Sequence, residues 1–100
     1  MPKIVKLGEL LKMREGTIFS EYKPQYTSGL YRFDGQCGPR DFYYQDLLGT
    51  VGDNNTPEFD LNSGSRWALY DEDEEFFVYE EEEVEILAEA LAATRDKEHT

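Results

Sequence analysis

The apolar residues of this chain come in short segments separated by residues that favour turns, and this spacing constrains the fold more than any other feature. Short segments rich in aromatic and branched residues, bounded by Gly, Pro, Asn or Asp, are typical of β-strands. No apolar segment approaches the ~20 residues that are needed to span a membrane. We therefore expect strands at residues 17–22, 30–33, 41–51, 66–70 and 76–79.

Turn-forming residues predict how these strands connect. Pro24 and residues 27–29 predict a turn that joins the first two strands in a hairpin, and residues 34–40 predict the next turn. The last two strands are expected to pair across an acidic turn at residues 71–75. Residues 52–65 form the longest irregular segment.

The two ends of the chain have helical patterns. Residues 3–13 predict a short strand and then a brief helix, because the leucines of this segment fall on one helical face. A longer helix is expected at residues 81–94, followed by a frayed tail at residues 95–100. The sequence therefore predicts one α+β domain over residues 1–94. Its fold is a small, curled antiparallel sheet of about five strands, with a short N-terminal helix and a longer C-terminal helix.

Charge is divided unevenly along the chain. Residues 1–50 hold seven Lys and Arg against six Asp and Glu, a net charge of +1. Residues 51–100 hold three against sixteen, a net charge of −13. A molecule with this distribution repels nucleic acid with its acidic half and attracts basic partners. We therefore expect no direct binding of nucleic acid.

Ten carboxylates fall among the fifteen residues from Asp71 to Glu85, and they have two interpretations. Residues 80–83 occupy the expected first helical turn, where carboxylates interact favourably with exposed amides and with the helix dipole; residues 71–75 would then be a turn that charge keeps soluble. Alternatively, the acids resemble one phosphate strand of a duplex and cover the basic groove of a nucleic-acid-binding protein. The residues expected to bind such a partner are Asp71, Glu72, Asp73, Glu74, Glu75, Glu81, Glu82, Glu85 and Glu89.

The expected C-terminal helix has two apolar stripes on either side of a glutamate ridge. The first stripe is its expected core face and consists of Val84, Leu87, Ala88 and Leu91. The second stripe, roughly 140° away around the helix, consists of Ile86, Ala90 and Ala93. This second stripe is either a half-covered flank or an edge at which two copies of the chain associate as a homodimer.

The N-terminal half of the chain interleaves aromatic and basic residues. Such residues can stack on bases and neutralise phosphates, although they are more often strand residues of a small core. An alternative to the acidic surface is therefore a site for a small ligand, such as a nucleotide signal, at a subunit interface. Its residues would be Lys23, Tyr31, Arg32, Arg40 and Tyr43.

The sequence contains no catalytic, cofactor or metal-binding motif. An EF-hand loop needs Gly at its sixth position, and a loop counted from Asp53 or Asp71 has none there. Cys37 is the only thiol, and the only histidine, His99, falls in the expected tail, so no Cys–His pair is predicted. We expect a protein that is not an enzyme and holds no cofactor and no metal. A single cysteine and a polar start favour the cytoplasm.

Three segments carry a resemblance to known proteins. They are ELLKMREGTIFSEYKP at residues 9–24, DFYYQDL at residues 41–47 and ALYDEDEEFFVYEEEEVEILAEAL at residues 68–91. These segments resemble a group of small acidic proteins that tailed phages and prophages encode. The resemblance implies a phage accessory protein in the cytoplasm of a bacterial host. Its partner would be a host protein with a basic nucleic-acid-binding surface, and its effect would be inhibition of the anti-CRISPR or anti-restriction type.

Overall fold

A computed structural model describes residues 1–61, 64–68 and 72–99 of the chain, with side chains as far as Ala93. In these residues the elements are β1 (Lys3–Lys6), α1 (Leu7–Leu10), β2 (Ile18–Lys23), β3 (Tyr26–Gly38), β4 (Asp41–Asp46), β5 (Thr50–Val51), a 3₁₀ turn (Asp53–Asn55), β6 (Pro57–Glu58), β7 (Ser65–Arg66), β8 (Glu75–Tyr79) and α2 (Glu81–His99).

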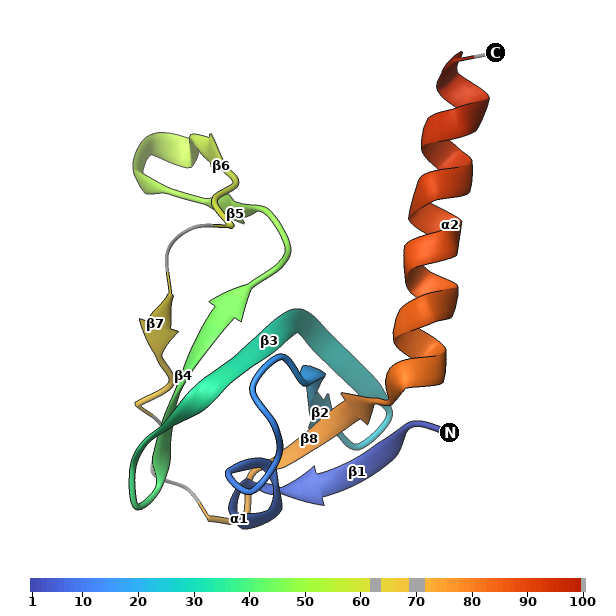
Figure 1. The fold of residues 1–100 in the computed structure, drawn as a ribbon. Coiled ribbons are helices and arrows are strands. Elements are labelled where there is room, and N and C mark those ends of the chain that lie inside the picture. Colours follow the sequence, from blue (N-terminus) through green and yellow to red (C-terminus); the bar gives the residue numbers. More distant parts are fainter. Residues whose placement is uncertain (62–63, 69–71, 100) are drawn as a thin grey trace.

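Six of the described strands form one antiparallel sheet in the order β1-β8-β2-β3-β4-β7 (Figure 1). β5 and β6 pair with each other on an arm beyond the end of β4. The short α1 follows β1, and α2 follows β8. The predicted α+β class is therefore confirmed, with an antiparallel sheet, a short N-terminal helix and a longer C-terminal helix.

The core is a cluster of aromatic rings on one face of the sheet. Phe19 is fully buried at its centre, and its ring centroid lies 5.4 to 5.8 Å from those of Tyr31, Phe42, Trp67 and Phe76. Edge-on contacts dominate, which is the arrangement that aromatic quadrupoles favour. The buried hydrophobic residues of the described chain are Val5, Leu7, Leu10, Phe19, Phe33, Phe42, Trp67, Phe76 and Val78.

The two turns expected around β3 are present, and the first joins β2 and β3 in the expected hairpin. Both are shorter than expected, because glycines that suggested turns lie inside the strand. Gly29 (φ 76°) and Gly35 (φ 108°) adopt left-handed conformations where the pairing register of β3 with its neighbours shifts. Such β-bulges admit an extra residue and bend a strand. The connections themselves are shorter, at residues 24–25 and 39–40.

The expected pairing of the last two strands is wrong. β8 lies between β1 and β2, whereas β7 pairs with β4 at the far edge of the sheet. β8 is thus a central strand, paired with β1 on one side and with β2 on the other, and its Phe76 and Val78 are buried in the core. The strand expected at residues 41–51 ends at Asp46, whose Oδ1 accepts a hydrogen bond from the Leu48 amide at 2.9 Å.

α2 does not cover the sheet, so the expected core face of this helix is wrong. α1 and Trp67 already complete the core against the apolar face of the sheet. The helix instead extends away from the end of β8 and runs to His99, beyond the expected end at residue 94 (Figure 1). Val84 is half-buried, whereas Leu87 is 37% exposed and Leu91 is 66% exposed.

Candidate functional site

α2 begins with a capping interaction. The backbone N–H of Glu80 donates to Oε1 of Glu83 at 3.0 Å, and the Glu80 carbonyl accepts a hydrogen bond from the Val84 amide at 3.0 Å. Nζ of Lys3 lies 3.6 Å from Oε1 of Glu80. These contacts stabilise the first helical turn. Glu80 and Glu83 therefore have the helix-starting role that the sequence suggests for this part of the acidic run.

The other glutamates of α2 face solvent. Successive members of the ridge at positions 81, 85 and 89 lie about 6 Å apart along the helix axis. No ion pair joins these glutamates, or Glu82, to another residue in the described part of the chain. Their charge is therefore available to a partner. The exposed residues of this group are Glu81, Glu82, Glu85 and Glu89.

The second apolar stripe of α2 is also uncovered. Ile86 is 66% exposed, and Ala90 and Ala93 are exposed as well. The stripe is thus accessible to a second copy of the chain, and self-association through it stays a prediction.

The acidic turn before β8 is used within the fold, in contrast to α2. Oε1 of Glu72 lies 3.6 Å from Nη1 of Arg40, and Oδ1 of Asp73 lies 3.8 Å from Nζ of Lys6. Oε2 of Glu74 accepts a hydrogen bond from Nε1 of Trp67 at 3.2 Å.

These contacts divide the expected partner-binding residues into two groups. Glu75 is a strand residue of β8, and Asp71 lies outside the described residues. The structure therefore leaves Glu81, Glu82, Glu85 and Glu89 of α2 as the acidic surface with no ion-pair partner among the described residues.

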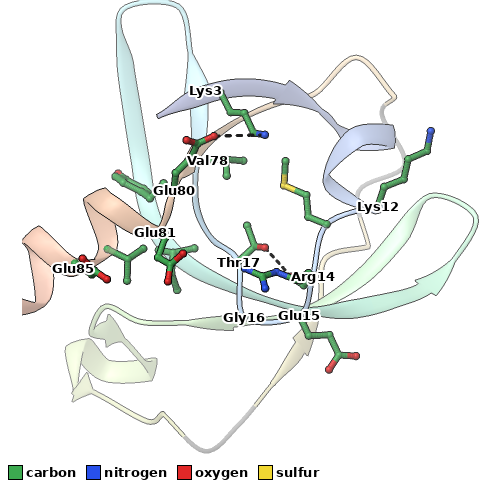
Figure 2. Close-up of a pocket in the computed structure, with 14 residues that line it drawn as sticks. Lys3, Lys12, Arg14, Glu15, Gly16, Thr17, Val78, Glu80, Glu81 and Glu85 are labelled. Carbon is green, nitrogen blue, oxygen red and sulfur yellow. Dashed lines mark hydrogen bonds and ion pairs between the residues drawn. The ribbon is translucent and has the colours of Figure 1, made fainter. Parts of the chain in front are cut away.

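A groove of about 690 Å³ lies where the first turn of α2 meets the segment between α1 and β2 (Figure 2). Glu81 and Glu85 line it from α2, and Lys12 and Arg14 line it from that segment. Neither Lys12 nor Arg14 forms an ion pair with a described residue. The apolar lining consists of Met13, Ile18, Val78 and Val84.

Sequence reasoning missed this groove. Lys12 and Arg14 have no motif around them, and they line a groove with α2 only because β8 places the start of the helix near them. The pairing of β8 between β1 and β2 was the missing information.

The residues of the alternative ligand site do not come together. Lys23 ends β2 and pairs with the first residue of β3, whereas Arg40 follows the far end of that 13-residue strand. Tyr31 packs in the core, where burial, with Glu21 and Asp46 adding to it, raises the pKa of its phenol to about 12.

The other two residues of that alternative have separate surroundings. Nε of Arg32 donates to Oδ1 of Asp34 at 3.0 Å. Tyr43 is half-exposed on β4, opposite Arg66 of β7. Neither the groove beside α2 nor the smaller groove lined by Arg40 contains Arg32 or Tyr43.

A buried carboxylate holds Trp67 in place. Oδ1 of Asp41 accepts hydrogen bonds from the amides of Phe42 and Ala68, both at 2.8 Å. Oδ2 lies 2.8 Å from Nε and 2.7 Å from Nη2 of Arg66. The Ala68 amide is the main cause that lowers the pKa of Asp41, with Arg66 and the Phe42 amide adding to it and burial opposing it. This carboxylate is therefore a structural anchor.

The thiol beside this anchor is not activated. Burial, with Asp41 adding to it, raises the pKa of Cys37, which keeps the sulfur protonated at neutral pH. Within residues 1–61, 64–68 and 72–99, no three His, Cys, Asp or Glu side chains are grouped to hold a metal ion. None of the helices in the same residues combines the length and the apolar character needed to cross a membrane.

Comparisons with models of protein families, with curated proteins and with solved structures find no match to this chain.

Proposed function

We propose that this protein is a binding protein, and not an enzyme, that places the acidic side of α2 on the basic nucleic-acid-binding surface of another protein. It thereby keeps nucleic acid from that surface.

The observation that carries this proposal is the contrast between the two acidic segments. The acids before β8 are paired with Arg40, Lys6 and Trp67, as expected of acids that serve the fold. Glu81, Glu82, Glu85 and Glu89 stand on a helix that leaves the sheet, and no described cation forms an ion pair with them. A ridge of charges ~6 Å apart matches a single phosphate strand in sign and approximate spacing.

The resemblance to small phage proteins supports a particular class of target. A phage accessory protein of this kind would act in the cytoplasm of a bacterial host. The proposed target is a host protein that handles nucleic acid in defence, such as a CRISPR effector or a restriction enzyme. Such proteins hold DNA or RNA in grooves lined with Lys and Arg, which attract an acidic surface over a distance.

The test is charge reversal on α2. A variant with Glu82→Lys, Glu85→Lys and Glu89→Lys should lose the ability to displace DNA from a panel of purified CRISPR effectors and restriction enzymes. A matched control reverses three exposed acids elsewhere, with Glu9→Lys, Asp53→Lys and Glu58→Lys. The control has the same net charge, so it should keep most of the activity if the position of the acids decides binding.

Salt provides an independent measurement. An interaction dominated by charge should weaken steadily as ionic strength rises, because the Debye length falls from ~10 Å at 0.1 M to ~3 Å at 1 M. The proposal fails if the α2 variant displaces DNA as well as the wild-type protein does. It also fails if the wild-type protein displaces DNA from no member of the panel.

A further inference from the structure

The apolar part of the groove lining continues into the first apolar stripe of α2. Val84 belongs to both, since it lines the groove and starts the stripe. One and two turns further along, Leu87 and Leu91 extend the same face of the helix into solvent. From Glu85 to Ala93 every side chain of α2 is exposed.

A helix in this situation needs an outside contact. Most helical stability in proteins comes from packing of an apolar face rather than from helix propensity. α2 touches the rest of its own chain mainly at β8, where the helix starts. The exposed stripe therefore indicates a surface that is covered in the assembled protein.

The charges around the groove fit a second copy of this chain. Lys12 and Arg14 are exposed and without ion-pair partners in the described residues. α2 supplies matching acids, because Glu89 lies on the flank of the stripe that also carries the groove-lining Glu81 and Glu85.

We propose that two copies of this chain form a dimer in which their α2 helices pack antiparallel along Val84, Leu87 and Leu91. With the two-fold axis level with residues 87 and 88, Val84 of each copy lies opposite Leu91 of the other. The two-fold axis is perpendicular to the plane that contains both helices. Rotation about it therefore keeps the flank with Glu81, Glu85 and Glu89 on the same side of that plane in both copies. The groove lies on that side, and Glu89 of each copy faces Arg14 of the other.

The groove is necessary to this arrangement. Three side chains that each bury ~60–120 Å² cover about 200–350 Å² per copy. A specific interface needs ~1,000 Å² in total, or about 500 Å² per copy. The groove and its two cations supply the remainder, and the cations offset part of the repulsion between chains that each carry a net charge of −12.

The dimer does not depend on the proposed function, and its test needs no target protein. Wild-type protein in sedimentation equilibrium should approach twice the 11.6 kDa of one chain as its concentration rises toward the millimolar range. Leu91→Gln should raise the dissociation constant at least about tenfold, which corresponds to losing ~1.4 kcal/mol of apolar contact. Ile86→Gln is the matched control, because Ile86 is equally exposed, at 66%, on the other side of the helix.

Charge exchange tests the pairing across the axis. Arg14→Glu and Glu89→Lys should each weaken the dimer, and the double variant should recover most of the loss because it restores opposite charges in both symmetric contacts. Fluorescence of Trp67 verifies that each variant is folded.

Three results would overturn the proposal. The first is a wild-type protein that stays monomeric at millimolar concentration. The second is a dimer that Ile86→Gln dissociates and Leu91→Gln does not, which would assign the interface to the stripe of Ile86, Ala90 and Ala93. The third is a double charge variant no better than the single ones.

Discussion

Removing the carboxylate of Asp41 should separate two contributions to the stability of this fold. The residue is 3% exposed, and its two carboxylate oxygens have different partners, since Oδ1 accepts two backbone amides and Oδ2 accepts Arg66. Asp41→Asn keeps an oxygen for the amides of Phe42 and Ala68 but presents N–H groups to the guanidinium. Asp41→Ala removes the acceptors for both.

The magnitudes follow from the surroundings of each oxygen. Arg66 is 56% exposed, so water screens its pairing, and Asp41→Asn should lower the free energy of unfolding by about 1–2 kcal/mol. Asp41→Ala also leaves two amides without acceptors, at about 1–3 kcal/mol, for a total loss of about 3–5 kcal/mol. The loss at Ala68 adds to the destabilisation by Asp41→Ala. The φ of Ala68 is 57°, a conformation that alanine rarely adopts, and its hydrogen bond to Asp41 maintains that conformation.

The assay is chemical denaturation followed by fluorescence of the single tryptophan. Trp67 lies in the core and its amide donates to the carbonyl of Phe42 at 2.9 Å, so its emission reports the segment that Asp41 anchors. Equal losses for Asp41→Asn and Asp41→Ala would refute the separate roles of the two oxygens. No loss in either variant would refute the anchor itself.

The same carboxylate gives a pH dependence of known sign. Its pKa is lower in the folded protein than in the unfolded chain, where Asp titrates near ~3.9. Its contribution is therefore complete above that unfolded value and is lost as pH falls through the lower folded value. Wild-type protein should lose this part of its stability at acid pH, and Asp41→Asn should lack that part of the pH dependence.

Two further predictions concern α2 and Tyr31. Glu83→Ala should destabilise the start of α2 by about 0.5–1 kcal/mol, because Glu80 N–H loses its acceptor, and should reduce the helical circular dichroism signal. The control is Glu82→Ala, one position away and uninvolved in capping, which should leave both quantities unchanged. An equal effect of the two substitutions would contradict the capping role. The tyrosinate absorbance should include a step near pH 12 that Tyr31→Phe removes, and its absence from the wild-type protein would contradict the burial of this phenol. Since this folded pKa is raised, the associated stability is complete below the ordinary value of ~10 and is lost as pH rises through about 12.

Local sequence patterns predicted the elements of this fold better than their arrangement. The short apolar segment at residues 76–79 identified β8, and the leucines at positions 7 and 10 identified α1. Gly29 and Gly35 led to the prediction of turns that were too long. A glycine in the left-handed conformation is found in turns and in β-bulges alike, and only the pairing with the partner strand distinguishes the two.

The sequence predicted the shared face of α2, but it did not predict what lies against that face. The helical period correctly placed Leu87 and Leu91 on one face of α2, but a period shows only which residues share a face. Whether this chain covers that face depends on how much of the sheet the aromatic core and α1 already occupy. The groove cations Lys12 and Arg14 gave no signal, since a groove exists only between elements that the sheet order brings together.

The central position of β8 also sets an order of events during synthesis. Among the described strands β1 pairs only with β8, so its pairing waits for a strand that is made much later. Until residues 75–79 emerge from the ribosome, β8 cannot join β1 to β2, and the rings of Phe19 and Phe42 lack their contact with Phe76. Bringing β1 and β8 together costs conformational entropy, because the chain between them is long, and this cost comes before the contacts between the two strands form. The nascent chain therefore completes this sheet only after residues 75–79 have been translated, and a chain that stops before β8 leaves β1 without its described strand partner.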